Sequence, residues 1–414
     1  MKYILVVGDG MADVALKALG GKTPLQTAEH PNMNLIASKG SAGLVKNVPP
    51  ECNPGTEVAF LSIFGHDPRK VNTGRGPLEA AGIGVKLGAD DLALRCNFVT
   101  VTGDNGGVLL DHSAGHISSD ESRCLLEAVK EHYENSGSIE FYPGVSYRHL
   151  LVLRGGKYSE KIVTSPPHDF LNTPIEGLLV KASAKEGQAT ADMLNKMILG
   201  SKEFLANHPV NRARVKSGKN PGNMIWPWGQ GRRPSIKTLQ ETTGLRGAAI
   251  SAVDIVNGIG RYVGLDIVKV PGATGYFDTN YEGKADYALK TLEDHDFVLV
   301  HVEAPDEASH AGDAGLKVKT IEDMDRRLLG PLLKGLKEEE DYTIMVMADH
   351  VTQTSDGAHS RSPVPYAIYS TKQKKSRSRG GGEAVQFDEV FLQKSTADTV
   401  EGKDILGRFL KQGE

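Results

Sequence analysis

Side chains of the kinds that bind metal ions lie just after several short apolar runs of the sequence. They are Asp9, Asp306, His310, Asp349, His350 and His359. Asp306 and His310 are four residues apart, so on a helical turn both would project from one face. Asp349 and His350 directly follow an apolar run and could reach two neighbouring metal positions. Such a mixture of carboxylates and imidazoles suits divalent ions such as Mn²⁺ or Zn²⁺ better than Ca²⁺.

Each of these residues by itself has a simpler interpretation. A lone Asp after a strand is more often a helix cap, and a lone His is more often a packed or surface side chain. The pairs Asp306/His310 and Asp349/His350 each follow a strand-like run, which favours a metal site over those interpretations. The metal site is therefore predicted from the whole set and not from any single member.

A candidate nucleophile, Thr56, lies between Gly55 and Glu57. Residues 57–63 have a helical pattern, so the Thr56 hydroxyl would lie at a helix start, where free N–H groups and the helix dipole favour an anion. A nearby metal ion would activate this hydroxyl as a nucleophile at neutral pH. The alternative is that Thr56 is only an N-cap, which Gly-Thr-Glu also suits.

These side chains would meet only if a sheet delivers them to one edge. Short apolar runs at residues 4–7, 296–302 and 342–347 alternate with longer helical patterns. This alternation predicts an α/β fold with a mostly parallel sheet flanked by helices on both faces. In open sheets of this kind, ligands bind outside the carboxyl ends of the strands, which is where the candidate ligands lie.

A change of pattern divides the chain into two domains, as its 414 residues also lead one to expect. Between residues 76 and 186, half-polar strand-like segments alternate with Gly, Pro and Asn turns. This pattern predicts a smaller α+β domain at 76–186, inserted into a metal-binding domain formed by 1–75 and 187–414.

The amino-acid composition limits the classes of binding partner and the cellular compartment to be expected. The net charge of −4 predicts no general attraction to nucleic acid or to an anionic membrane. The three cysteines, Cys52, Cys96 and Cys124, form no CxxC pair, and no apolar run approaches the roughly 20 residues needed to cross a bilayer. We therefore expect a cytoplasmic protein. The basic run at 371–382 is interpreted as a solvated loop and not as a nucleic-acid patch.

Two glycine-containing segments fall short of known nucleotide-binding motifs. The segment GDGMAD at 8–13 lacks the third glycine of a dinucleotide fingerprint. The segment at 21–23 (GKT) matches the end of a P-loop, but Leu16 stands where the first glycine belongs. Neither segment predicts binding of ATP.

Seven segments in this order resemble the cofactor-independent phosphoglycerate mutases, specifically the archaeal-type branch of the alkaline-phosphatase superfamily. They are GDGMAD at 8–13, PGTEVAFLSIFGHDP at 54–68, TGRGPLEAAGIGV at 73–85, HPVN at 208–211, EAPDEASHAGD at 303–313, ADH at 348–350 and DGAHSRSPVP at 356–365. The resemblance covers nearly the whole chain, and the set of motifs is highly specific although each alone is weak.

The resemblance implies a fold like that of alkaline phosphatase and a site with two metal ions. Asp9, Thr56, Asp349 and His350 would hold one ion, and Asp306, His310 and His359 the other. Mn²⁺ is the expected ion, with Zn²⁺, Co²⁺ and Mg²⁺ as alternatives. Thr56 matches the family's nucleophile, which becomes transiently phosphorylated.

The resemblance also implies that the inserted domain closes over a small phosphorylated carboxylate substrate and supplies basic groups. Arg148, His168 and Asp169 match or lie near such positions. Weaker candidates for binding the substrate phosphate or carboxylate are Arg75, Arg212, Arg214, Arg232 and Arg233.

The implied activity is the interconversion of 2- and 3-phosphoglycerate without 2,3-bisphosphoglycerate, through a phosphothreonine intermediate. Two departures leave alternatives open. The family usually has Gly-Ser-Asp where this chain has Gly-Thr-Glu, and the segment at 223–231 (NMIWPWGQG) looks like a sub-branch proposed to act as homoserine kinase. One alternative is thus a homoserine kinase-like enzyme, or another phosphotransferase or phosphatase. A more distant one is a non-catalytic, metal-stabilised protein in which Thr56 is only a cap.

Overall fold

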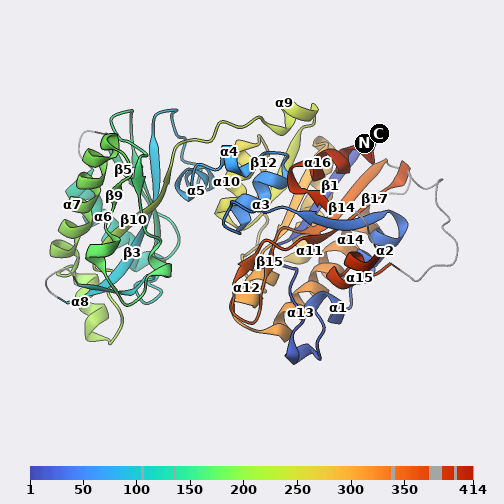
Figure 1. Cartoon of the computed structure of the whole chain (residues 1–414), viewed down its shortest axis with the longest axis horizontal. Helices are drawn as coiled ribbons and strands as arrows, with labels where there is room; N and C mark the ends of the chain where they lie inside the picture. Colours follow the sequence, from blue (N-terminus) through green and yellow to red (C-terminus); the bar gives the residue numbers. More distant parts are fainter. Residues whose placement is uncertain (104–106, 135–136, 337–340, 373–384, 396–398, 414) are drawn as a thin grey trace. The chain divides into compact units, whose positions relative to one another are not determined.

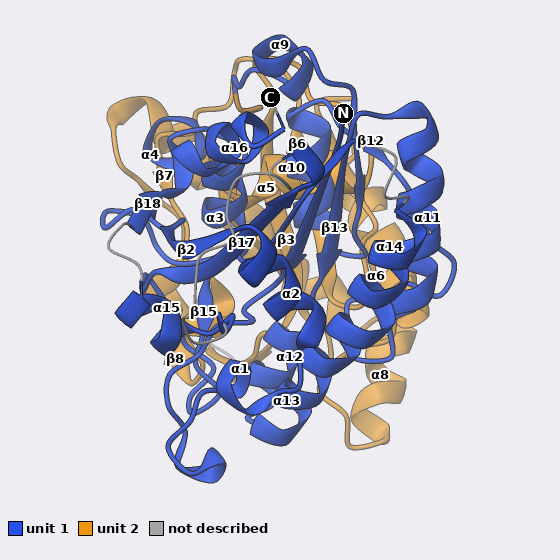
Figure 2. Ribbon diagram, turned by 90° about the vertical axis from the view of Figure 1, so that its right-hand side faces the viewer, with its two compact units in different colours: residues 1–72, 235–414 blue, residues 73–234 orange. Residues whose placement is uncertain are grey.

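A computed structural model describes residues 1–103, 107–134, 137–336, 341–372, 385–395 and 399–413 (Figure 1). The chain forms two compact units, which Figure 2 shows in different colours. Unit 1 consists of Met1–Asn72 and Ser235–Glu414, and unit 2 of Thr73–Pro234. Most of the basic run at 371–382 lies outside the described residues. Within the described part of the chain, no helix combines the length and the apolarity that a membrane span requires.

Unit 1 is built on an eight-stranded sheet with the order β12-β11-β13-β1-β14-β17-β2-β18. These strands are β12 (Asp266–Ile267), β11 (Gly247–Ile250), β13 (Phe297–Val302), β1 (Lys2–Gly8), β14 (Tyr342–Ala348), β17 (Val364–Ser370), β2 (Ser41–Lys46) and β18 (Thr399–Glu401). Every pairing from β12 to β14 is parallel, and β17 runs antiparallel to both its neighbours. The three central strands are buried along almost their whole length, as their continuous apolar sequences predict for strands covered on both faces.

Helices cover the two faces of this sheet (Figures 1 and 2). On one face, α3 (Thr56–Ile63) packs against α10 (Asp254–Tyr262) and α16 (Gly402–Lys411). The other layer contains α2 (Pro31–Lys39), α11 (Tyr281–Asp294), α13 (Ala314–Asp323), a π-helical segment (Met324–Leu329) and α14 (Gly330–Gly335). Shorter elements are α1 (Pro24–Thr27), α4 (Pro68–Val71), α9 (Leu239–Thr243), α12 (Ala304–His310), α15 (Glu389–Ser395) and the hairpin of β15 (Val351–Thr352) and β16 (His359–Ser360). The predicted α/β architecture with a mostly parallel sheet is confirmed.

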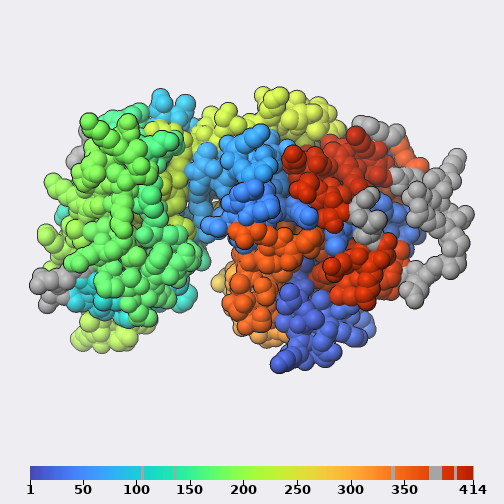
Figure 3. All heavy atoms as spheres, viewed as in Figure 1, coloured from blue at the N-terminus to red at the C-terminus, as the bar shows by residue number. Residues whose placement is uncertain are grey.

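Unit 2 is built on an antiparallel sheet with helices. Its strands are β3 (Leu92–Thr102), β4 (Val108–Asp111), β5 (Ile139–Tyr142), β6 (Arg148–Leu153), β8 (Thr173–Pro174) and β10 (Met224–Gly231), with a separate pair, β7 (Ile162–Val163) and β9 (Lys181–Ala182). Its helices are α5 (Arg75–Gly82), α6 (Ser119–Tyr133), α7 (Gln188–Leu205) and α8 (Pro209–Lys216). Helices α6 and α7 pack against each other, and Figure 3 shows the heavy atoms of this unit as spheres.

The second unit extends to Pro234, well beyond the boundary expected at residue 186. Strand β10 pairs with β3 in the centre of the unit, so the chain leaves this sheet only after Gly231. Helix α7 packs on β10, and its buried residues Leu194 and Ile198 belong to the same apolar core as Trp226. The helical pattern after residue 187 predicted a return to the main sheet. The helix that it forms, α7, instead packs on the sheet of the inserted unit.

A buried ion pair joins the two chain segments that follow β1 and β14. The ammonium group of Lys317 on α13 is fully buried and donates to Asp13 Oδ2 (3.0 Å), Ala12 O (3.2 Å) and Thr352 O (2.7 Å). Asp13 Oδ2 also accepts from the amide (3.1 Å) and the hydroxyl (2.6 Å) of Thr354. Burial lowers the pKa of Lys317, and the charge of Asp13 opposes that shift. Because each donor of the ammonium has an acceptor, the pair holds the two segments in a fixed register.

Replacing Lys317 by Met should destabilise the protein by about 3–5 kcal/mol, because it leaves the Asp13 carboxylate buried without its cation. The free energy of unfolding, measured by urea titration, tests this expectation. The matched control is K319M on the same helix. Lys319 is exposed, and the buried Asp323 carboxylate with which it pairs also pairs with Arg326 and Arg327, so the loss of Lys319 should cost less than about 1 kcal/mol. Equal stabilities of the two variants would contradict a structural role for the buried pair.

Candidate metal centre and active site

The sheet order of unit 1 brings three ligand-bearing segments together. Strands β13, β1 and β14 are adjacent and parallel, so their carboxyl ends meet at one edge. Asp9 directly follows β1, α12 with Asp306 follows β13, and Asp349 directly follows β14. A fourth segment, the β15–β16 hairpin, begins two residues later and carries His359. The sequence prediction that these side chains share one sheet edge is thus matched by the topology.

The candidate ligands form two overlapping groups. Atoms of Asp9, Asp349 and His350 lie within 4.8 Å of one another, and so do atoms of Asp306, His350 and His359. His310 adjoins the second group, because its Nε2 lies 3.1 Å from Asp306 Oδ2 and 3.1 Å from His359 Nε2. His350, which the family resemblance assigns to the first ion only, belongs to both groups.

Thr56 lies beside the first group and does not cap its helix. Helix α3 begins at Thr56, its N-cap is Gly55, and that cap has no side-chain hydrogen bond. The Thr56 hydroxyl lies 3.4 Å from Asp9 Oδ2 and 3.4 Å from His350 Nε2. The hydroxyl thus faces the ligands, and the alternative that Thr56 serves only as an N-cap does not describe this geometry.

Several carboxyl groups are buried close together at this sheet edge, where a positive charge would stabilise their ionised forms. Burial raises the pKa of Asp9 well above its usual value, and the charges of Asp349, Glu303 and Asp306 raise it further. Burial also raises the pKa of Asp349. Burial opposes ionisation of Asp306 too, but hydrogen bonds from His310 and His359 outweigh it and hold the pKa of that carboxyl well below its usual value. Two buried oxygens, Asp9 Oδ1 and Asp349 Oδ2, accept no hydrogen bond, and each lies 3.4 Å from Nε2 of His350.

This donor set fits divalent metal ions. Buried carboxylates without partners are costly unless a cation neutralises them. Bound ions would supply that charge and would explain why two oxygens are left without a donor. The combination of carboxylate oxygen and imidazole nitrogen is one that Mn²⁺, Zn²⁺ and related ions accept.

The structure adds residues that the sequence prediction missed. His301 on β13 and Glu303 just after it form a third group with Asp9, with ligand-type atoms within 4.8 Å. Burial and the charge of Asp306 raise the pKa of Glu303 to about 8. Thr352 donates to Asp306 Oδ1 (2.5 Å), and its hydroxyl lies 3.2 Å from His350 Nδ1. In the sequence, only their positions near the candidate ligands could have indicated these residues. His301 lies inside an apolar strand, and Thr352 is two residues past His350.

Several of the substrate-binding candidates gather in one part of unit 2. Arg148 is exposed and stacks on Tyr147, with its guanidinium carbon 4.6 Å from the ring centroid. His168 lies 3.6 Å from Asp169, and its pKa is lowered by burial and also by the charges of Arg75 and other cations. Burial and the charges of Arg75 and Arg148 lower the pKa of Arg95, whose charge also acts on His168. Arg75, Arg148, His168 and Asp169 therefore belong to one cluster of mainly cationic side chains.

This cationic cluster includes residues that were not predicted. The guanidinium of Arg95 lies 5.1 Å from the Trp228 ring and pairs with Glu79 at 2.8 Å. The ring of His168 packs edge-on against Trp228 at 5.3 Å. A buried Arg on a strand gives no distinctive sequence signal, although Trp228 lies in the segment that departs from the family pattern.

The other four arginines lie elsewhere or are engaged within the fold. The buried Arg214 pairs with Glu121 (2.7 Å) and donates to three backbone carbonyls. Arg232 donates to the carbonyls of Asp90 and Tyr158. Arg212 and Arg233 are exposed. Arg214 and Arg232 thus hold unit 2 together, which leaves their guanidiniums few donors for a substrate.

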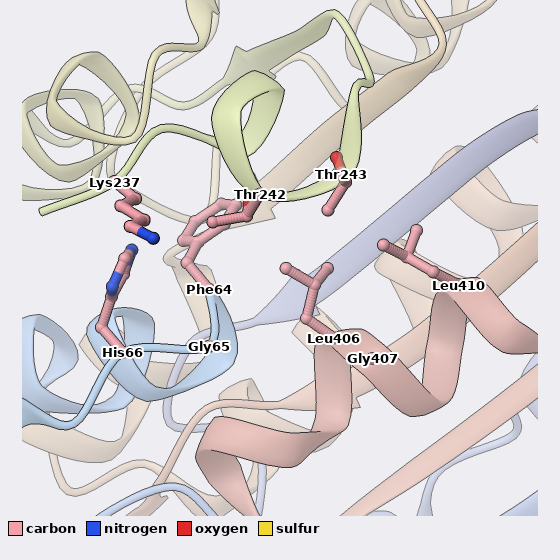
Figure 4. Close-up of a pocket in the computed structure, with 9 residues that line it drawn as sticks. All are labelled: Phe64, Gly65, His66, Lys237, Thr242, Thr243, Leu406, Gly407 and Leu410. Atoms are coloured by element: carbon pink, nitrogen blue, oxygen red, sulfur yellow. The ribbon is translucent and has the colours of Figure 1, made fainter.

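A separate cavity of about 320 Å³ lies in unit 1 and contains none of the predicted ligands. It is lined mainly by apolar groups such as Phe64, Leu406 and Leu410, and Figure 4 shows the Lys237 side chain pointing toward the His66 ring at one end. Burial lowers the pKa of His66. The cavity offers no set of metal-binding side chains.

The sequence and fold match those of known proteins. A family model described as 2,3-bisphosphoglycerate-independent phosphoglycerate mutase matches residues 37–211, and one described as type I phosphodiesterase / nucleotide pyrophosphatase matches residues 186–383. A protein of Methanosarcina barkeri named 2,3-bisphosphoglycerate-independent phosphoglycerate mutase is 46% identical over 99% of this chain and 100% of its own length. A second protein of that name from Methanothermobacter thermautotrophicus, distinguished by the number 2, is 48% identical over 94% of this chain and 91% of its own.

Two solved structures share the fold over the whole chain. The structure of a Pyrococcus horikoshii protein aligns with a TM-score of 0.82 at 29% identity, covering 100% of this chain and 97% of that one. The structure of cofactor-independent phosphoglycerate mutase from Thermoplasma acidophilum aligns with a TM-score of 0.67 at 29% identity, covering 100% of both chains. With near-complete coverage at more than 40% identity, the chain belongs to the 2,3-bisphosphoglycerate-independent phosphoglycerate mutase family.

Proposed function

We propose that this protein interconverts 2- and 3-phosphoglycerate through a phosphothreonine intermediate, independently of 2,3-bisphosphoglycerate. The observation that carries the proposal is the position of the Thr56 hydroxyl, which lies 3.4 Å from both Asp9 and His350 at the start of α3. Family membership supports the substrate, since relatives along the full length carry this name. The unpaired cysteines and the lack of a membrane-crossing helix among the described residues are compatible with work in the cytoplasm.

Two divalent ions, proposed to be Mn²⁺, would be held at the carboxyl ends of the strands. Asp9, Thr56, Asp349 and His350 would bind one ion, and Asp306, His310 and His359 the other, with His350 near both. When bound, such ions lower the pKa of a hydroxyl and neutralise the charge on phosphoryl oxygens.

Thr56 forms and breaks the covalent bonds to phosphorus in the proposed reaction. Its Oγ1 gives up its proton and attacks phosphorus in line with the bond to the substrate oxygen, which leaves with the electron pair of the broken P–O bond and takes up a proton. The other glycerate hydroxyl then gives up its proton and attacks the phosphothreonine, and Thr56 Oγ1 leaves with the electron pair and takes up a proton, which regenerates the Thr56 hydroxyl. Free N–H groups in the first turn of α3 favour the negative charge at this end of the helix.

The cationic cluster of unit 2 is the proposed binding place for the substrate carboxylate. Arg75 and Arg148 supply guanidinium groups, and planar guanidinium donors suit a carboxylate. The edge-on packing of His168 against Trp228 restrains the imidazole beside them.

The departing segment at 223–231 gives limited support to homoserine phosphorylation. Trp226 and Trp228 are 2% and 4% exposed and belong to the core of unit 2. These two differences from the usual mutase sequence therefore affect the packing of the core. The segment GKT at 21–23 also has a structural role, because Thr23 forms a capping box with Gln26 at the start of α1.

The purified protein should contain about two divalent ions per chain when measured by plasma mass spectrometry. A chelator should abolish turnover and Mn²⁺ should restore it, because the buried carboxylates need cations to act together. D306N should lose one of the two ions, whereas D266N, which alters an exposed carboxylate outside the site, should keep both. Full activity after exhaustive chelation, with no metal detected, would exclude the two-metal site.

Replacing Thr56 by Ala should reduce turnover by at least about 1,000-fold, whereas T56S should retain measurable activity because its hydroxyl can still attack. The Thr56 side chain makes no capping hydrogen bond, so the free energy of unfolding of T56A should lie within about 1 kcal/mol of the wild-type value. Wild-type turnover by a folded T56A variant would show that the hydroxyl is not the nucleophile.

The substrate is tested by ³¹P NMR in two parallel incubations. With 3-phosphoglycerate alone we expect 2-phosphoglycerate, little free phosphate, and no need for ATP or bisphosphoglycerate. With ATP and homoserine we expect no new phosphate ester. Phosphohomoserine in the second incubation, together with unchanged 3-phosphoglycerate in the first, would replace the mutase assignment with the kinase.

A further inference from the structure

His301 is a fully buried histidine on β13 that contacts Asp9 and has no part in the mechanism above. Its Nε2 lies 2.8 Å from Asp9 Oδ2, and its Nδ1 lies 3.0 Å from the hydroxyl of Ser251. Ser251 directly follows β11, the neighbour of β13 on the side away from β1. One imidazole therefore connects segments from three consecutive strands of the sheet.

The contacts determine which ring nitrogen carries the proton. An ionised Asp9, as a metal ligand must be, only accepts hydrogen bonds, so Nε2 of His301 is the protonated nitrogen and donates. Nδ1 is then the acceptor, and the Ser251 hydroxyl must donate to it. The same hydroxyl oxygen accepts a hydrogen bond from the amide of Val253 at 3.1 Å, which orients its proton toward the ring.

Both ring nitrogens are thus engaged, which argues against direct metal binding by His301. Asp9, His301 and Glu303 could together suggest a third cation position, since their ligand-type atoms lie within 4.8 Å of one another. To bind a cation, His301 would have to give up the 2.8 Å contact with Asp9 or the 3.0 Å contact with Ser251.

Packing restrains the imidazole in this orientation. The ring of Phe60 on α3 lies edge-on to it, with centroids 5.4 Å apart and planes at 77°. The ammonium of Lys284 donates to the backbone carbonyl of His301 at 2.7 Å. Because the side chain is completely buried, it can hold the Asp9 carboxylate in one position, with Asp9 Oδ1 accepting no hydrogen bond and lying 3.4 Å from Nε2 of the candidate ligand His350.

We propose that Ser251 and His301 are positioning residues for Asp9, which hold its Oδ2 through a chain of two hydrogen bonds and leave Oδ1 directed at a divalent cation. This inference rests on the proposed role of Asp9 as a metal ligand. Hydrogen bonds of this kind set the orientation and basicity of a ligand, and their loss typically weakens metal affinity 10–100-fold.

The test measures Mn²⁺ affinity by following the free ion with EPR during titration of the metal-depleted protein. S251A removes the donor to Nδ1 and should weaken Mn²⁺ binding at the site that contains Asp9 by about 10–100-fold. H301L should weaken binding at that site at least as much. S251T retains the hydroxyl and should bind close to the wild type. H295L is the matched control, because His295 lies just before β13, hydrogen-bonds Asp266 and Thr291, and has no contact with the ligands.

A second measurement reports the positioning directly. Nitrogen-15 NMR of the His301 ring in the wild type loaded with diamagnetic Zn²⁺ should show a single tautomer protonated at Nε2, and S251A should shift this equilibrium. Folding of each variant is checked by circular dichroism, and S251A alone decides the question if H301L does not fold.

Wild-type Mn²⁺ affinity in folded S251A and H301L would overturn the inference while leaving the two-metal site intact. Three bound ions in the wild type, one of them lost in H301L, would instead make His301 a ligand and would also overturn it. A wild-type protein that binds no Mn²⁺ would overturn both this inference and the proposed function.

Discussion

Negative charge buried at one edge of a parallel sheet is the constraint on which the rest of this structure depends. Asp9 and Asp349 are completely buried and Asp306 is 5% exposed. Carboxylates in such surroundings are stable only when protonated, paired or bound to cations. His310 and His359 pair with Asp306, and His301 pairs with Asp9 Oδ2, but one oxygen each of Asp9 and Asp349 has no hydrogen-bond partner. The edge is therefore suited to holding cations and, with them, a phosphoryl group.

A comparison with the buried Asp13 separates structural from functional charge in the same unit. Asp13 Oδ2 accepts from the Lys317 ammonium and from the amide and hydroxyl of Thr354. That pair is complete within the protein and needs nothing from outside. Asp9 lies four residues earlier in the same segment, and its Oδ1 has no hydrogen-bond partner. The ion pair connects the segment after β1 to the segment after β14, and so supports two segments that carry candidate metal ligands.

The two units use their sheets for different purposes. In unit 1 the parallel order places the ends of β13, β1 and β14 side by side, which concentrates ligands at one edge. In unit 2 the antiparallel pairing of β10 with β3 sets Trp228 against Arg95. Arg95 packs over the ring of Trp228 and His168 packs edge-on against it, so one buried aromatic side chain restrains both. The segment that departs from the family pattern thus forms part of the cationic cluster as well as the core.

The sequence by itself determined the α/β class and the family, and it identified the candidate metal ligands together with Thr56. These properties are carried by local patterns, because an apolar run followed at once by Asp or His already specifies a strand and a polar group at its end. Only the tertiary structure decided that Thr56 faces Asp9 and not its own helix, and that His350 lies between two ligand groups. It also decided where the inserted unit ends, since the pairing of β10 with β3 joins segments more than 100 residues apart. His301 lies 292 residues from Asp9 and 50 from Ser251, and its place inside an apolar strand resembles that of any core residue. No local pattern could reveal that contact, because it arises from the order in which the strands assemble.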